Sequence, residues 1–175
     1  MKRTWLWVPL ALFGLFFGVM AVGLNKPSST TITSKMIGKP LPKFSLPPAH
    51  APQPGLGSAS FQQGQPRLLN IFASWCIPCI AEAPVLLDMA RKGVPIDAIA
   101  IRDRPQDVNR FLQRNGNPYQ RIGSDVNSAV QMALGSSGVP ETFVVDGRGI
   151  IRFQHIGDIR PEDVPDIMAA LRAAR

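Results

Sequence analysis

Cys76 and Cys79 are the only two cysteines of this 175-residue chain, and they stand three positions apart. A disulfide between such close neighbours closes too short a loop to restrain the unfolded chain much, so the pair is a poor structural staple. Two thiols one helical turn apart are instead suited to reversible thiol–disulfide exchange. We therefore interpret the pair as a reaction centre.

A zinc site and an inert structural disulfide are the alternative interpretations of this pair. Structural zinc is almost always held by four ligands. Besides the cysteines, the chain offers only His50 and His155 as typical zinc ligands, and these lie in unrelated sequence contexts. We favour redox chemistry, and we expect neither a metal nor a cofactor.

The pair stands where a strand is predicted to end and a helix to begin. Residues 68–73 form a short, mostly apolar run, as expected of a central strand covered on both faces. A helical pattern follows from about residue 76 to residue 91, and Gly93 is placed to end it. Pro78 suits the first helical turn, where a backbone donor is not missed.

This placement assigns different roles to the two thiols. Free N–H groups and the helix dipole stabilise an anion at a helix start, so we expect the pKa of the Cys76 thiol to fall below the free value of about 8.5. Cys79 lies one turn later on the same face, within reach of a mixed disulfide formed at Cys76. The hypothesis is that Cys76 attacks and Cys79 resolves.

The remaining pattern predicts an α/β protein with helices on both faces of a sheet. Further extended segments are expected at residues 95–101, 119–122, 142–145 and 150–155, and helices at 105–115, at 126–134 and from Pro161 onward. The last two strands are joined by residues 146–149, Asp-Gly-Arg-Gly, which is a strong hairpin signal.

A second group of residues, 138–143, precedes one of these strands. A proline that opens a strand cannot donate to the ladder, and a cis bond there would make a tight bend. The backbone of Val139 could then hydrogen-bond an extended substrate that lies across the sulfurs. The simpler interpretation of Pro140 is an ordinary loop proline.

The N-terminus predicts export from the cytoplasm. Residues 5–24 carry no charge, and 20 helical residues span roughly the 30 Å hydrocarbon core of a bilayer. A cleaved signal peptide is the competing interpretation, since residues 21–23 offer a small-x-small site. We expect an uncleaved anchor at 1–24, a Pro/Ser/Thr-rich linker at 25–36 and a working domain at 37–175 outside the cytoplasm.

The net charge of +7 does not indicate a nucleic-acid partner. Lys2, Arg3 and Lys26 flank the apolar run and supply three of these charges. The other basic residues are scattered along the chain without interleaved aromatic residues. A solvated basic surface is the expected result, and no nucleic acid is expected to bind.

Several blocks resemble one family of known proteins. Residues 75–79, Trp-Cys-Ile-Pro-Cys, followed by Pro84, resemble the active-site helix of thioredoxins. A closer resemblance, to the DsbE/CcmG proteins of cytochrome c maturation, is carried in order by residues 37–40, 68–76, 116–119, 138–143 and 146–152. The resemblance implies a thioredoxin-like fold, a mixed sheet flanked by helices, behind an N-terminal transmembrane helix.

The resemblance also implies a direction of electron flow. Such proteins are periplasmic reductants held by a single helix in the bacterial inner membrane. They keep the haem-binding cysteines of apocytochrome c reduced, directly or through a partner maturation protein, and a membrane donor of the DsbD/CcdA type re-reduces them. The alternatives are a TlpA/ResA-like anchored thioredoxin that reduces other targets, such as a copper-site protein, and a redox-inert peptide-binding module.

Residue roles follow from the same resemblance. Pro140 is the implied cis-proline and Glu82 the active-site acid, while Trp75, Val139, Pro140 and Glu141 are expected to contact substrate. Asn70 stands where thioredoxins carry a buried Asp, and Glu82 is placed to take over its proton transfer. An exposed, purely structural Glu82 is the alternative. The chain departs from the family at residues 136–137, where Ser-Ser replaces the usual Val-Tyr.

Overall fold

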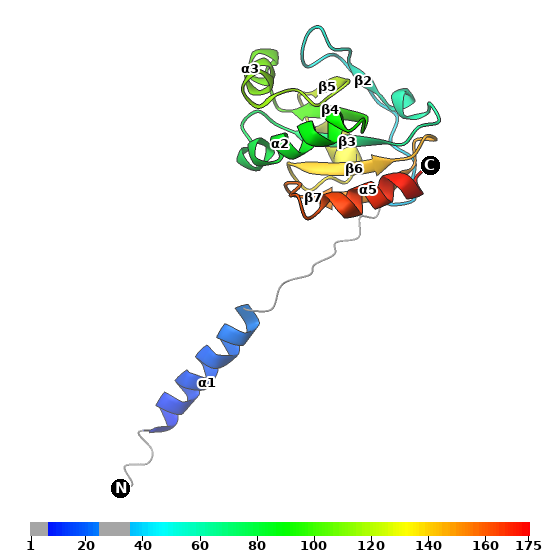
Figure 1. Cartoon of the computed structure of the whole chain (residues 1–175). Coiled ribbons are helices and arrows are strands. Elements are labelled where there is room, and N and C mark those ends of the chain that lie inside the picture. Colours follow the sequence, from blue (N-terminus) through cyan, green and yellow to red (C-terminus); the bar gives the residue numbers. More distant parts are fainter. Residues whose placement is uncertain (1–6, 25–35) are drawn as a thin grey trace. The chain divides into compact units, whose positions relative to one another are not determined.

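The computed structural model describes residues 7–24 and 36–175, in two compact units that comprise residues 1–32 and 33–175 (Figure 1). The first unit contains α1 (Trp7–Leu24). Six of its large apolar side chains are 50 to 66% exposed: Leu12, Phe13, Leu15, Phe16, Phe17 and Met20. Among the described residues, no helix combines the length and hydropathy needed to cross a bilayer. The expected linker, 25–36, lies outside the described residues except at its last position.

The second unit is built on a five-stranded mixed sheet with strand order β5-β4-β3-β6-β7. Strands β3 (Arg67–Phe72), β4 (Ile96–Ile101) and β5 (Ile122–Asp125) run parallel. Strands β6 (Glu141–Val145) and β7 (Ile151–Ile156) form the predicted hairpin. Strand β6 pairs antiparallel with β3, and β7 pairs antiparallel with β6 at the edge of the sheet. All residues of β3, β4 and β6 are buried, as expected of strands covered on both faces.

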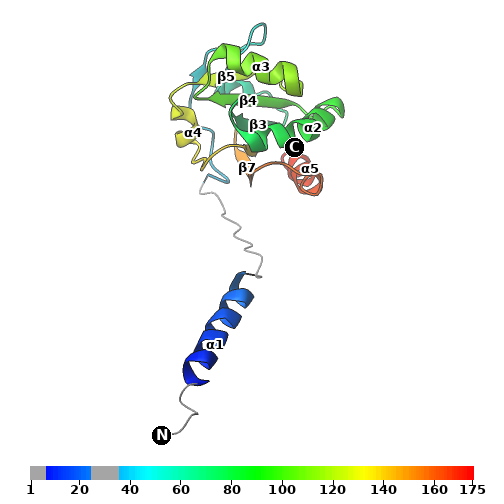
Figure 2. The same ribbon diagram turned by 90° about the vertical axis from the view of Figure 1, so that its left-hand side faces the viewer.

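Helices cover both faces of this sheet. Figure 2 shows α2 (Ile77–Arg91), α3 (Pro105–Asn115) and α5 (Val164–Ala173) on one side and the short α4 (Ala129–Ala133) on the other. Helices α2 and α3 share a side because the crossovers β3-α2-β4 and β4-α3-β5 both move toward the β5 edge of the sheet. Parallel crossovers are almost always right-handed, so two that move in the same direction place their helices on the same face. The expected α/β class is confirmed.

The N-terminal part of the second unit packs along the sheet edge. The N–H of Gly38 donates to Ile151 O and the N–H of Leu41 donates to Gly149 O, both at 2.8 Å. A small two-stranded sheet follows, formed by β1 (Ser45–Leu46) and β2 (Leu56–Gly57). A 3₁₀ turn, η2 (Ser58–Phe61), then leads toward β3 and buries Phe61 completely.

Three predicted segments have different boundaries in the structure. The strand expected at 119–122 is β5 at Ile122–Asp125, and the helix expected at 126–134 is shortened to α4. The reason is Asp125, whose carboxylate ends the strand and accepts the N–H groups of Ala129 and Gln131, both at 2.9 Å. The last helix starts at Val164 rather than Pro161, because residues 161–163 form a turn.

The topology brings three loops to one edge of the sheet. Parallel β3 and β4 both end there, and antiparallel β6 begins there. The loops are residues 73–76, 102–104 and 136–140. The residues expected to carry the chemistry therefore meet at the carboxyl ends of β3 and β4.

Candidate functional site

Cys76 and Cys79 form a disulfide at the start of α2, with their Cα atoms 5.3 Å apart. Cys76 is the N-cap residue, and its Sγ accepts the N–H of Cys79 at 3.2 Å. Pro78 occupies the first turn, as predicted. A backbone donor and the positive end of the helix dipole thus lie at the Cys76 sulfur, where they favour an anion once the disulfide is reduced.

Apolar side chains surround the buried disulfide on the protein surface. Trp75 is 55% exposed, Ile77 79% and Ile80 45%, whereas the two cysteines are at most 4% exposed. Exposed apolar residues grouped around a reactive bond offer contact area to another polypeptide.

Glu82 is buried behind the disulfide, one turn along α2. Only 1% of the residue is exposed, so the alternative of an exposed structural Glu82 is wrong. Its Oε1 accepts a hydrogen bond from Asn70 Nδ2 at 3.0 Å and its Oε2 accepts the N–H of Ile159 at 3.1 Å. Burial raises the pKa of Glu82 to about 7, although these two hydrogen bonds lower it. The carboxyl group can thus gain or lose a proton near neutral pH.

Asn70 joins Glu82 to two residues that the sequence did not assign to the site. Its Oδ1 accepts the hydroxyl of Tyr119 at 2.9 Å, and its Nδ2 also donates to Thr142 Oγ1 at 3.0 Å. Thr142 lies directly opposite Asn70 in the β3–β6 pairing. Both residues belong to blocks that carry the family resemblance. The β3–β6 register places Thr142 beside Asn70, whereas the fold brings Tyr119 to Asn70 from the segment before β5.

A second buried carboxylate holds the turn in front of the disulfide. Asp103 accepts the N–H of Ser74 at 2.6 Å and the hydroxyl of Ser74 at 2.5 Å. Burial raises the pKa of Asp103, and the hydrogen bonds from Ser74 oppose that rise. The sequence reasoning missed Asp103, although a signal exists: it follows β4, and the carboxyl ends of adjacent parallel strands meet at one edge.

The loop before β6 presents a free backbone segment. The Val139–Pro140 peptide bond is cis, as the family resemblance implies. Among the described residues, neither backbone group of Val139 takes part in a hydrogen bond. Trp75 and Val139 line a common groove of about 470 Å³. An extended polypeptide in this groove can pair with Val139 in the manner of an added strand.

Comparison with known proteins identifies the family. A Redoxin family model matches residues 36–171. The chain is 36% identical over 176 residues to the thiol:disulfide interchange protein DsbE of Vibrio cholerae. That alignment covers 98% of this chain and 95% of the Vibrio cholerae protein. It is 40% identical over 159 residues to DsbE of Pseudomonas fluorescens biotype C, covering 91% and 88%. The chain belongs to the DsbE family of thiol:disulfide interchange proteins.

A solved structure agrees with this assignment. A Chlorobium tepidum protein described as a thiol:disulfide interchange protein DsbE superposes with a TM-score of 0.67 at 26% identity, over 79% of this chain and 96% of that one. The protein is therefore a thiol:disulfide oxidoreductase with a thioredoxin-like fold.

Among the residues that the structure describes, no group of three His, Cys, Asp or Glu side chains could hold a metal ion.

Glu141 occupies a different place from the one expected of a substrate-contacting residue in a DsbE protein. It is fully buried, so its side chain has no exposed surface with which to contact substrate in this structure. Its carboxylate accepts the hydroxyl of Ser136 at 2.5 Å, the N–H of Ser137 at 2.9 Å and the side-chain amide of Gln154. Burial raises the pKa of Glu141, and the hydrogen bonds from Ser136 and Ser137 oppose that rise. The two serines that depart from the family pattern thus bind the acid of the cis-proline loop.

Proposed function

We propose that this DsbE-family protein is a membrane-tethered periplasmic reductant in c-type cytochrome maturation. Its Cys76/Cys79 dithiol keeps the haem-binding cysteines of apocytochrome c reduced, directly or through a partner maturation protein. The observation that carries the proposal is the kinship with DsbE proteins along nearly the whole chain. The ordered blocks that resemble the cytochrome c maturation family support it further.

In this proposal the reaction starts from the dithiol form. The Cys76 thiolate attacks one sulfur of a client disulfide, which forms a mixed disulfide and releases the first client thiolate. The Cys79 thiolate then attacks the Cys76 sulfur and releases the second. The client gains two electrons and becomes a dithiol, while the protein is left with the Cys76–Cys79 disulfide.

Glu82 is the proposed proton acceptor for Cys79. The resolving thiol must lose a proton before it attacks, and Glu82 lies buried on the same helix, one turn further on. A carboxyl group with a pKa of about 7 is partly ionised at neutral pH and can accept that proton. Asn70 and Ile159 orient its two oxygens.

The client is proposed to lie across the sulfurs against Trp75, Val139 and Pro140. Trp75 supplies exposed aromatic surface, and Val139 supplies unpaired backbone groups beside the cis bond. Main-chain pairing of this kind accepts many sequences, which suits an enzyme whose substrate is a disulfide.

The proposed location is the inner membrane, with the second unit in the periplasm. Residues 5–24 form the proposed tether in the lipid bilayer. The exposed apolar side chains of α1 support a lipid environment, and Trp5 and Leu6 lie outside the described residues. A membrane donor of the DsbD/CcdA type is the proposed source of electrons, since each turnover leaves the protein oxidised.

Deletion of the gene tests this function. The proposal predicts loss of all c-type cytochromes on a haem-stained gel, restored by the wild-type chain and not by Cys76→Ser. Intact c-type cytochromes with a defect in a copper-site protein would favour the TlpA/ResA-like alternative instead. The reduction potential of the pair is an independent check, because a reductant should lie near thioredoxin's value of about −270 mV and an oxidant near about −120 mV.

A further inference from the structure

A pocket lined by arginines lies beside the reactive disulfide. It has a volume of about 550 Å³. Three of its lining residues belong to the active-site segment: Ser74, Trp75 and Ile80. The opposite wall is formed by the β4–α3 loop and α3, and contributes Arg102, Arg104, Arg110 and Arg114. We refer to this space as the arginine pocket.

The two carboxylates of the arginine pocket already have partners. Asp103 is 9% exposed and binds Ser74, and Asp107 forms an ion pair with Arg110 on the same helix. Arg104 and Arg114 are exposed, and within residues 36–175 neither forms an ion pair. The pocket therefore holds positive charge that no carboxylate of the described residues neutralises.

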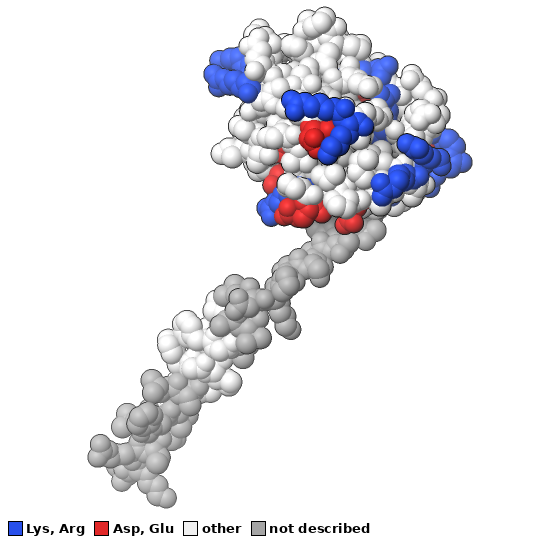
Figure 3. All heavy atoms as spheres, viewed as in Figure 1, with Lys and Arg blue, Asp and Glu red and all other residues white. Residues whose placement is uncertain are grey.

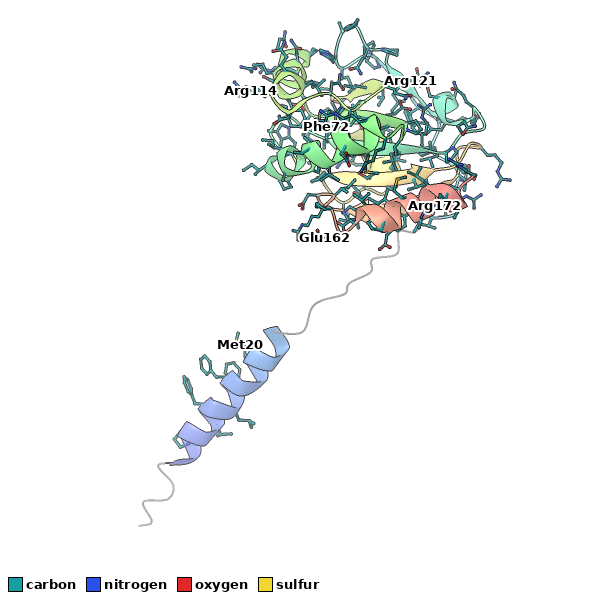
Figure 4. The ribbon with its side chains drawn as sticks, in the orientation of Figure 1. Met20, Phe72, Arg114, Arg121, Glu162 and Arg172 are labelled. Carbon is teal, nitrogen blue, oxygen red and sulfur yellow. A yellow bond between two sulfur atoms is a disulfide. The ribbon has the colours of Figure 1, made fainter. Side chains whose placement is uncertain are left out.

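Part of this positive charge is visible in Figures 3 and 4. In Figure 3 a cluster of basic side chains lies over α3 at the upper left of the second unit, without red atoms beside it. Figure 4 labels Arg114 in that position, on α3. Arg102 adds a further guanidinium, whose Nε donates to the hydroxyl of Ser128 at 3.0 Å.

The arginine pocket adjoins the groove beside the cis-proline loop. Trp75 and Arg102 line both spaces, and the groove continues to Val139. Trp75 directly precedes Cys76, and Ile80 directly follows Cys79. A polypeptide that pairs with Val139 and crosses the disulfide is thus led past Trp75 to Arg104 and Arg114.

We propose that the arginine pocket binds an acidic segment, with Asp or Glu side chains, next to the reactive cysteines of a client polypeptide. Guanidinium groups bind carboxylates through paired N–H donors, and unpaired surface charges steer an oppositely charged partner. This inference rests on the proposed reductase function, for which it defines the chemistry of the preferred client.

The test uses three synthetic peptides that each contain one Cys-Ala-Ala-Cys disulfide. They differ only in the flanking residues, which are pairs of Glu, Gln or Lys. The full-length chain in neutral detergent is reduced, freed of reductant and mixed with each peptide, and the second-order rate constant of peptide reduction is measured. Redox-inert versions with Ser for Cys are titrated in parallel by fluorescence anisotropy, which reports binding without electron transfer.

We expect the Glu peptide to be reduced about tenfold faster than the Gln peptide at low salt, and the Lys peptide more slowly than both. Salt at about 1 M should largely remove this order, because the Debye length falls to about 3 Å. The double variant R104Q/R114Q should also remove it. The matched control R148Q/R172Q changes exposed arginines outside the pocket and should keep it.

Equal rates for the three peptides, or an order unchanged in R104Q/R114Q, would overturn the proposal while the reductase function stands. Failure to reduce any peptide would instead count against the reductase function, and the anisotropy ranking would then decide the pocket. A one-to-one site for inorganic phosphate without discrimination among the peptides would assign the pocket to small anions and overturn the proposal.

Discussion

Asn70 on β3 and Glu82 on α2 are joined by a 3.0 Å hydrogen bond from the Asn70 amide to the Glu82 carboxylate, inside the protein. The partner of this buried carboxylate is thus a neutral amide and not a positively charged side chain. It orients the group but compensates little of the cost of burying a charge. The pKa of Glu82 consequently rises to about 7, within the range where proton transfer at neutral pH is efficient.

Glu82→Gln should slow thiol–disulfide exchange roughly 100-fold at pH 7.5, because glutamine cannot accept the proton of Cys79. The wild-type rate should rise with pH through an inflection near pH 7 as Glu82 ionises. The variant should lack that inflection. Stopped-flow measurements of exchange with a peptide disulfide between pH 5 and 9 check this, with the exposed Glu162→Gln as control. Identical pH profiles for wild type and Glu82→Gln would rule out the role.

The same carboxyl group should make stability depend on pH. The folded-state pKa of Glu82, about 7, lies above the unfolded value of about 4.5, so the folded state binds the extra proton between these values. Its contribution is therefore most favourable below pH 4.5 and declines as pH rises toward 7. The total is about 3 kcal/mol.

Urea denaturation of the oxidised protein at pH 4.5 and 8 measures this contribution. The loss of unfolding free energy between the two pH values should be smaller in Glu82→Gln than in wild type by about 3 kcal/mol. Glutamine offers one acceptor oxygen where Asn70 and Ile159 need two, so a further loss common to both pH values is expected. An equal pH-dependent loss in both proteins would contradict the raised pKa.

Cys79→Ser should trap clients on Cys76, because the attacking thiol remains and the resolving thiol is gone. Mixed disulfides should appear on non-reducing gels of detergent-solubilised membranes and disappear with reductant. The reciprocal variant, Cys76→Ser, should give few or none. If Cys76→Ser were the better trap, the two cysteine roles would have to be exchanged.

Tyr119→Phe should destabilise the protein by roughly 1–3 kcal/mol, because the Oδ1 atom of Asn70 is left buried without its donor. The stacking of this ring on Phe72, with centroids 5.1 Å apart, should survive the change. Denaturant unfolding measures the difference. A loss below about 0.5 kcal/mol would show that the hydroxyl does not support Asn70.

Glu141→Ala should act through the loop before β6 and not through client charge. The variant leaves the N–H of Ser137 and the side-chain amide of Gln154 without their acceptor, while the Ser136 hydroxyl keeps Gly138 O. We therefore expect roughly 1–3 kcal/mol lower stability. The ratio of reduction rates for the Glu and Lys peptides should stay as in wild type. A change in that ratio with stability unaffected would return Glu141 to the client-contacting surface.

The sequence by itself determined the reactive pair, the strand and helix that hold it, the β6–β7 hairpin and the α/β class. These features follow from local patterns: apolar runs, turn residues, a proline at a helix start and two cysteines one turn apart. The family blocks added the cis bond at Pro140 and pointed to Glu82 as the active-site acid.

Only the tertiary structure decided where the buried polar groups point. The β3–β6 register placed Thr142 opposite Asn70, and the meeting of parallel strand ends placed Asp103 against Ser74. The same packing turned Glu141 inward and set the arginines of α3 beside Trp75. The physical reason is that burial, pKa and charge complementarity depend on neighbours far apart in the chain, which no local pattern specifies.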